Sequence, residues 1–203
     1  ADYQEFVVNN SERAEGFQEF DSQVLGLEWI ETQRKFYEGD PKLWVVWHEA
    51  YGSLNLKLLA SNYSHVVLPN EEIESVTNLA IVTKSYQRQF GTNFHALGCA
   101  KPDNLRQIPF ATASTLSWLS PMRRGETIVW DGQRIVRYPK RMKDQARPRY
   151  KNIIQKAGLD YSEFIGDSTL EPTRVAVWSY KRLEESMDKK TPDFHIIEGG
   201  KDS

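Results

Sequence analysis

Cysteine is almost absent from this 203-residue sequence, which contains Cys99 and no other. A single thiol cannot form a disulfide within the chain, and it cannot supply the clustered thiolates of a structural zinc site. The disulfide frameworks of small secreted proteins are therefore excluded. A reducing compartment, the cytoplasm, is the expected location.

Long apolar segments are also missing. No run approaches the roughly 18 uninterrupted apolar residues that a membrane span needs, and the polar opening from Ala1 to Asn10 lacks a signal-peptide core. A phosphate-binding loop, a dinucleotide fingerprint and a kinase signature are absent as well. The sequence thus predicts neither a membrane partner nor a cofactor.

The chain has no large excess of either charge, since its formal net charge is -2. The distribution is uneven, however, because residues 123–156 contain eleven Lys and Arg against three acidic residues, with Trp130, Tyr138 and Tyr150 between them. Cations for phosphates and aromatic rings for bases are what a nucleic-acid surface uses. Nucleic acid, DNA or tRNA, is therefore a predicted partner of 123–156. The alternative is a solvated face folded against the acidic remainder of the chain.

Short apolar runs alternate with longer stretches of helical spacing through the first two thirds of the chain. Strands are predicted at Phe20–Leu25, Leu43–His48, His65–Leu68, Phe94–Leu97 and Phe110–Thr115. Helices are predicted at Tyr3–Asn9, Glu28–Glu38, Ser53–Ser61, Glu71–Phe90 and Pro102–Gln107. Asn70 before acidic residues is typical of a helix start, and Gly39 and Gly91 stand where helices should end.

Strand-helix alternation of this kind predicts right-handed crossovers and a parallel sheet. The fold class is therefore α/β, and we expect a partial or incomplete TIM-like (β/α) barrel with about five parallel strands. An open sheet is the alternative. In the barrel case, a protein partner or a segment preceding Ala1 would supply the remaining strands.

The pattern changes after Gly125. Asp131-Gly132 predicts a tight β-hairpin between Thr127–Trp130 and Arg134–Tyr138. Helices are predicted to follow at Arg149–Ala157 and Pro172–Met187. The expected organisation is a barrel-like core over 1–125, a hairpin, basic segment and helices packed on that core over 126–190, and a flexible tail over 191–203.

Candidate functional groups follow from the rule that parallel α/β folds gather them at the carboxyl ends of strands. The positions selected are Gln23 to Gly26, His48-Glu49, Pro69-Asn70, His95 with Gly98-Cys99, and Ser114 to Trp118. His48 and His95 could orient a substrate or move a proton, or each could bond a backbone carbonyl and cap the core. A metal site is not favoured, because only Glu49 lies at ligand spacing from either histidine.

Nucleophilic catalysis has little support at this level. Ser114 and Thr115 lack the Gly-x-Ser-x-Gly turn that exposes a catalytic serine, so a hydrolase triad is not favoured. Cys99 lies four residues from His95, a separation that indicates nothing about a stabilised thiolate.

A set of ordered motifs resembles a known family. The motifs are Gln23-Val24-Leu25-Gly26, Trp44 to His48, Phe94 to Gly98, Pro109 to Leu119 and Arg124-Gly125. Together they resemble the tRNA-guanine transglycosylase superfamily, closest to its short phage and bacterial members such as the deazaguanine DNA transglycosylases. The resemblance implies an eight-stranded barrel and exchange of guanine in nucleic acid for a deazaguanine, through a covalent aspartate intermediate. It also implies host cytoplasm if the chain is phage-encoded.

The resemblance assigns roles residue by residue. Ser114 stands where the family has its nucleophilic aspartate, and Gln23 stands where it has a base-recognising aspartate; Asp21, on the same strand face as Gln23, is the candidate substitute. The catalytic candidates are Asp21, Ser114 and His95. The substrate-binding candidates are Gln23, His48, Glu49, Gly98, Trp118, Arg123 and Arg124.

Three functions remain open from the sequence. The leading one is a transglycosylase-like subunit or fragment that binds a nucleic-acid base or nucleotide. The second is a non-catalytic nucleic-acid- or protein-binding assembly protein on the same scaffold. The third is a small-molecule enzyme that uses His48 and His95 as acid and base.

Overall fold

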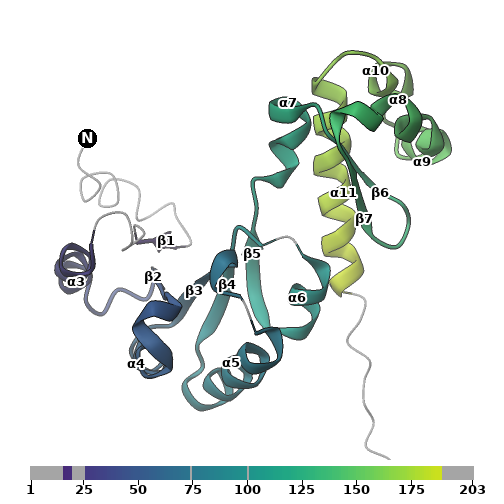
Figure 1. Ribbon diagram of the computed structural model, residues 1–203. Coiled ribbons are helices and arrows are strands. Elements are labelled where there is room, and N and C mark those ends of the chain that lie inside the picture. Colours follow the sequence, from purple (N-terminus) through teal and green to yellow (C-terminus); the bar gives the residue numbers. More distant parts are fainter. Residues whose placement is uncertain (1–15, 20–25, 74, 100, 189–203) are drawn as a thin grey trace, which may run out of the picture. The chain divides into compact units, whose positions relative to one another are not determined.

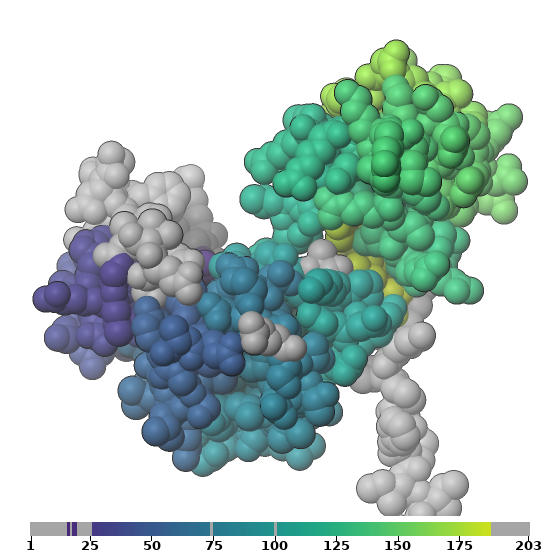
Figure 2. Space-filling model, viewed as in Figure 1, coloured from purple at the N-terminus to yellow at the C-terminus, as the bar shows by residue number. Residues whose placement is uncertain are grey.

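A computed structural model describes residues 16–19, 26–73, 75–99 and 101–188 (Figure 1). The chain divides into two compact units, which we call unit 1 (1–116) and unit 2 (117–203). The atoms of each unit are closely packed in the space-filling view, with most of unit 1 in blue and teal and unit 2 mainly in green (Figure 2). The sequence had grouped residues 117–125 with the core over 1–125, whereas this division groups them with unit 2.

Unit 1 is built on a parallel sheet whose strands follow one another in chain order. Its strands are β1 (Phe17–Gln18), β2 (Leu43–Val46), β3 (His65–Pro69), β4 (Asn93–Leu97) and β5 (Phe110–Ser114). The four longer strands confirm the α/β class and the parallel pairing. Within the described residues the sheet is open, with β1 and β5 at its two ends, so no barrel is shown.

The strand expected at Phe20–Leu25 and the helix expected at Tyr3–Asn9 lie outside the described residues. The first described strand of the sheet is β1. The tail expected over 191–203 also lies outside the described part of the chain.

Helices connect the strands of unit 1. They are α3 (Leu27–Phe36), α4 (Gly52–Asn62), α5 (Val76–Phe90) and α6 (Pro102–Gln107), with 3-10 turns η1 (Glu49–Tyr51) and η2 (Asn70–Glu72). The expected helix over Glu71–Phe90 was wrong at its start, because the acidic residues after Asn70 form η2 and α5 begins at Val76. Its end was right: Gly91 adopts a left-handed φ of 76° and closes the helix through its N–H to the Gln87 carbonyl.

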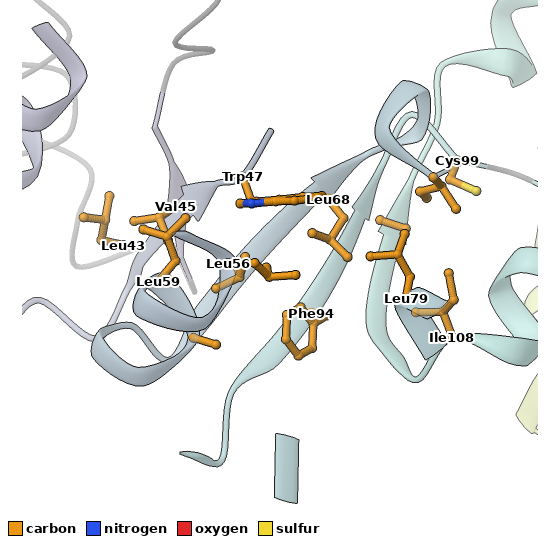
Figure 3. Packing of buried hydrophobic residues seen from close by; sticks show 14 of the residues in the cluster. Leu43, Val45, Trp47, Leu56, Leu59, Leu68, Leu79, Phe94, Cys99 and Ile108 are labelled. Carbon is orange, nitrogen blue, oxygen red and sulfur yellow. The ribbon is translucent and has the colours of Figure 1, made fainter. Parts of the chain in front are cut away.

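The core of unit 1 lies on one face of the sheet (Figure 3). Alternate strand residues point into it, including Val45, Val66 and Phe94, each fully buried. Leu56 and Leu59 of α4 pack against them, with Leu79 of α5. Crossovers of one hand between neighbouring parallel strands place their helices on the same side, which is why this face is the apolar one.

Unit 2 contains the predicted hairpin, β6 (Thr127–Trp130) paired antiparallel with β7 (Ile135–Tyr138). Asp131 stabilises the turn, because its Oδ1 accepts from the backbone N–H groups of Gln133 and Arg134 at 2.9 Å each. Gly132 has a φ of 106°, a conformation that favours glycine. The sequence therefore determined this hairpin locally.

Helices complete unit 2. They are η3 (Ser117–Leu119), α7 (Ser120–Arg124), η4 (Lys140–Met142), α8 (Lys143–Ala146), η5 (Arg147–Tyr150), α9 (Lys151–Lys156), α10 (Tyr161–Ile165) and α11 (Leu170–Asp188). The helix expected at Arg149–Ala157 is shorter than predicted, and α7, α8 and α10 were not predicted. Val129, Ile154 and Val175 form a second buried cluster, which gives unit 2 its own core.

None of the described helices has both the length and the apolar character needed to cross a bilayer.

Candidate functional site

The face of the sheet opposite the core carries polar side chains together with the buried Val46 and Val67. Alternation along β2 places Trp44, Val46 and His48 on this face, and the strand register aligns Val46 with Val67, His95 and Thr112. We call it the second face. His48 and His95 therefore share a face, but they are two strands and two residues apart, roughly 12 Å at the usual strand spacing and rise. Each has its own partners.

His95 lies between two hydroxyl groups of the neighbouring strand. Its Nδ1 is 2.8 Å from Oγ1 of Thr112, and its Nε2 is 3.0 Å from Oγ of Ser114. Burial lowers the pKa of His95 below its ordinary value, so the imidazole is neutral at pH 7. The sequence had selected His95 and Ser114 but missed Thr112, whose role depends on the pairing of β4 with β5.

Aromatic rings flank this cluster. The indole of Trp44 lies 5.1 Å from the His95 ring, tilted by 50°, and stacks on His65 at 5.0 Å and 13°. Burial lowers the pKa of His65, and a hydrogen bond involving the Pro41 backbone partly opposes that shift. The second face thus presents two neutral imidazoles beside an indole. Neither Trp44 nor His65 was selected from the sequence as a site residue.

His48 is paired with a carboxylate that the sequence did not select. Its Nδ1 lies 2.9 Å from Oε1 of Glu72, and Oε2 of Glu72 accepts the Glu49 backbone N–H at 3.0 Å. The imidazole is only 1% exposed and meets the Tyr51 ring edge-on at 5.9 Å. A carboxylate at Nδ1 keeps a proton on that nitrogen, so the pair can orient the ring. The sequence had predicted Glu72 in the first turn of a helix, whereas it lies in η2.

Glu19 forms a buried ion pair at the end of β1. Its two oxygens accept from Arg34 Nη2 at 2.6 Å and Nε at 2.8 Å, and Oε1 also accepts the Val46 N–H at 2.6 Å. Burial lowers the pKa of Arg34, but the hydrogen bond and charge of Glu19 raise it more, so the net shift is upward. This bidentate pair joins α3 to the sheet edge. Sequence reasoning missed both residues because their contact is set by tertiary structure.

The other predicted site residues are placed as follows. Asp21 and Gln23 lie outside the described residues. Glu49 has an exposed side chain and contributes its backbone N–H to Glu72. Gly98 follows β4 and has a φ of 72°. A Cβ added at this glycine would lie 3.9 Å from the Asn70 side chain. Trp118, Arg123 and Arg124 belong to unit 2, so a pocket shared with His48 and His95 stays a prediction.

The basic segment of unit 2 has two kinds of cation. Arg147 is buried. Three further cations form ion pairs: Arg134 with Asp131 at 3.6 Å, Arg137 with Glu126 at 2.6 Å, and Lys143 with Asp167 at 2.5 Å. The others are exposed, and the described part of the chain gives them no carboxylate partner within ion-pair distance. They are Arg123, Arg124, Lys140, Arg141, Arg149, Lys151 and Lys156. We call these seven residues the basic surface.

The aromatic residues of this segment do not lie on that surface. Trp130 is 9% and Tyr150 8% exposed, and the Tyr138 and Tyr150 hydroxyls are 2.8 Å apart. Burial, followed by the hydrogen bond to Tyr138, raises the pKa of Tyr150. The prediction that these rings stack on bases was wrong for Trp130 and Tyr150, since both are buried; Tyr138 is partly buried and packs against the core of unit 2. The prediction that the cations of this segment bind phosphates is not affected by the burial of these rings.

Metal ligands do not gather in the described residues: no group of three His, Cys, Asp or Glu side chains could hold an ion there. Cys99 is buried in the core of unit 1. Comparisons with family models, with curated proteins and with solved structures find no match to this chain.

Proposed function

We propose that this chain is a transglycosylase-like protein that binds nucleic acid, with phosphates on the basic surface of unit 2 and a base at the second face of unit 1. The observation on which the proposal depends is the basic surface itself. Seven exposed cations lack a carboxylate partner among the described residues, and positive charge that is not neutralised in this way attracts polyanions. Phosphate contacts of this kind supply affinity without reading sequence.

The second face supports the base-binding half. Trp44 and His65 offer ring faces, while Thr112 and Ser114 offer hydroxyl donors and acceptors. The motif resemblance, which covers residues from about Phe17 to Gly125, places Ser114 where a base-exchanging family has its nucleophile. These features suit recognition of a purine-like base.

Base exchange by this chain alone is not part of the proposal. Ser114 has a hydroxyl in place of the aspartate, and a hydroxyl is un-ionised near pH 7 and a poor nucleophile at a glycosidic carbon. The carboxylates of Glu19 and Glu72 are engaged by Arg34 and His48. Incubation with labelled guanine and DNA or tRNA should therefore give no incorporation. Clear turnover would show that the chain is an active exchange enzyme.

A salt titration tests the phosphate surface. The full chain should bind a fluorescent DNA or RNA duplex with an affinity that falls steeply with salt, and Lys140→Gln with Arg141→Gln should make the log-log slope shallower by about 0.9 per lost contact with B-DNA. The matched control is Lys57→Gln with Lys84→Gln, two exposed lysines of unit 1. Binding that ignores salt, or that responds equally to both pairs, would contradict the proposal.

A second candidate is an assembly protein whose sheet is completed by a protein partner. The observation that favours it is β5, which lies at the end of the described sheet and has Ala111, Thr112 and Ala113 exposed. An unpaired edge strand is a template for another strand. Native mass spectrometry that finds a stable complex, together with salt-independent or absent nucleic-acid binding, would favour this candidate.

A further inference from the structure

Ser114, Thr112 and His95 form a connected array on the second face. Thr112 and Ser114 are two residues apart on β5, so both side chains point to the same face, and the imidazole from β4 reaches both. The distances, 2.8 Å to Thr112 and 3.0 Å to Ser114, are hydrogen-bond distances. The pairing of the two strands therefore positions a serine, a histidine and an orienting hydroxyl in one line.

A neutral imidazole has one N–H and one lone pair. In the tautomer with the proton on Nδ1, the ring donates to Thr112, and Nε2 accepts the hydroxyl proton of Ser114. This is the arrangement that activates a serine, with a base at hydrogen-bond distance and a third group behind the base. Burial keeps the pKa of His95 low, so the base stays unprotonated at neutral pH.

Ser114 is reached from the second face. Thr112, its neighbour on that face of β5, is exposed and small, and Ser114 is itself half-buried. His95 is 8% exposed and lies under Trp44, which shields the imidazole from bulk water. The array thus combines a sheltered base with a reachable nucleophile.

We propose that Ser114 is an activated nucleophile that accepts the acyl group of small carboxylic esters, with His95 as its general base and Thr112 as a positioning residue. Ser114 Oγ bonds to the ester carbonyl carbon while its proton moves to His95 Nε2. The ester C–O bond breaks, and the alcohol leaves with that proton. Water then attacks the acyl-serine in the same way, which releases the carboxylic acid and restores the hydroxyl. This activity does not depend on nucleic-acid binding.

The structure also provides a matched comparison. Ser64 Oγ lies 3.1 Å from His65 Nδ1, but its hydroxyl donates to the Pro41 carbonyl at 2.9 Å. Its proton is therefore committed elsewhere, and His65 cannot remove it. Ser64→Ala should leave esterase chemistry unchanged, whereas Ser114→Ala should abolish it.

The test is acetylation of the full chain by p-nitrophenyl acetate, followed by peptide mapping by mass spectrometry. We expect an acetyl group on Ser114 in the wild type and in Ser64→Ala. His95→Gln should slow it by about 100-fold or more, the usual contribution of a general base. Thr112→Val, nearly isosteric on an exposed strand, should slow it by a smaller factor while KM for the ester stays unchanged.

The result that overturns the proposal is the absence of acetyl on Ser114 in folded wild-type protein, or an equal rate in a folded His95→Gln variant. Circular dichroism and thermal unfolding establish the folded state of each variant. If His95→Gln fails to fold, a Thr112→Val rate equal to the wild type overturns the proposal, and a slower rate supports it. Nucleic-acid binding is measured on the same samples, so failure here is distinguishable from failure of the proposed function.

Discussion

Units 1 and 2 each bury an arginine, and they stabilise the charge in different ways. In unit 1 the Arg34 guanidinium forms a bidentate pair with the Glu19 carboxylate. In unit 2 the Arg147 guanidinium donates to Thr127 Oγ1 at 3.0 Å and to the Phe164 and Gly166 carbonyls at 2.8 and 3.0 Å, with its centre 5.5 Å from the Phe164 ring. Burial lowers the pKa of Arg147, and Asp144 and Asp167 partly offset this.

The comparison shows that the N–H donors of a buried guanidinium need hydrogen-bond acceptors, and that these acceptors can be neutral carbonyl and hydroxyl oxygens in place of a carboxylate. Helix ends supply the acceptors in unit 2, because the last carbonyls of α10 have no partner within the helix. An ion pair supplies them in unit 1. The two solutions should respond differently when one partner is removed, since only the ion pair leaves an uncompensated charge.

The largest effect is expected in unit 1. Glu19→Ala leaves Arg34 nearly buried without its carboxylate, which should lower the free energy of unfolding by about 3 to 5 kcal/mol. Native-state hydrogen exchange of β2 and β3 peptides measures the loss for unit 1 alone. Glu28→Gln, an exposed carboxylate on the same helix as Arg34, is the control. A loss below about 1 kcal/mol would mean that Arg34 escapes to solvent and that the pair contributes little.

A smaller effect is expected in unit 2. Arg147→Met keeps a long side chain beside Phe164 but leaves two carbonyls and a hydroxyl without their donor, at a cost of about 2 to 3 kcal/mol. Exchange rates of β6 and α11 peptides report it. Arg149→Met, on the exposed side of the same η5 turn, should change stability by less than about 0.5 kcal/mol. Equal losses for Arg147→Met and Glu19→Ala would remove the distinction between the two units.

The smallest effect depends on pH and concerns Glu126 of unit 2. Burial raises its pKa, but hydrogen bonds from Ser120 and Arg137 and the charge of Arg137 lower it more, so the net pKa is below the ordinary value. A carboxylate with a lowered folded pKa stabilises the protein above its unfolded pKa of about 4.3, and this stabilisation is lost as pH falls through the folded pKa. Unit 2 of the wild type should therefore weaken below about pH 4.3.

Glu126→Gln should flatten that acid dependence in urea unfolding curves recorded between pH 6 and pH 3. Glu184→Gln, an exposed carboxylate on α11, is the control and should follow the wild type. Identical pH profiles for wild type and Glu126→Gln would show that the Ser120, Glu126 and Arg137 contacts do not stabilise unit 2.

Local chemistry made much of the fold predictable. The hairpin at Asp131-Gly132 depends on one side chain that bonds two nearby amides, and α5 ends at Gly91 because glycine adopts positive φ. Strand positions followed from runs of apolar residues that are buried on both faces. The start of α5 was mispredicted because the acidic residues after Asn70 suit a helix terminus, while Glu72 is instead held by His48.

The candidate site was only half predictable. His48, His95 and Ser114 could be selected because strand ends can be read from the sequence. Their partners Glu72 and Thr112 could not, since each lies on a different strand or turn and depends on register. The sequence also could not tell which residues of 123–156 are exposed. The structure leaves seven of its cations exposed, whereas Trp130 and Tyr150 are buried.

The sequence by itself determined the class of this protein, its parallel strands, its hairpin and its uneven charge, because these follow from backbone preferences and composition over short distances. Tertiary structure alone decided which groups meet: Glu19 with Arg34, His48 with Glu72, and His95 with Thr112 and Ser114. The physical reason is that a hydrogen bond depends on atoms within about 3 Å, and the packing of strands, helices and turns brings such atoms together from positions that are 15 to 24 residues apart in the chain.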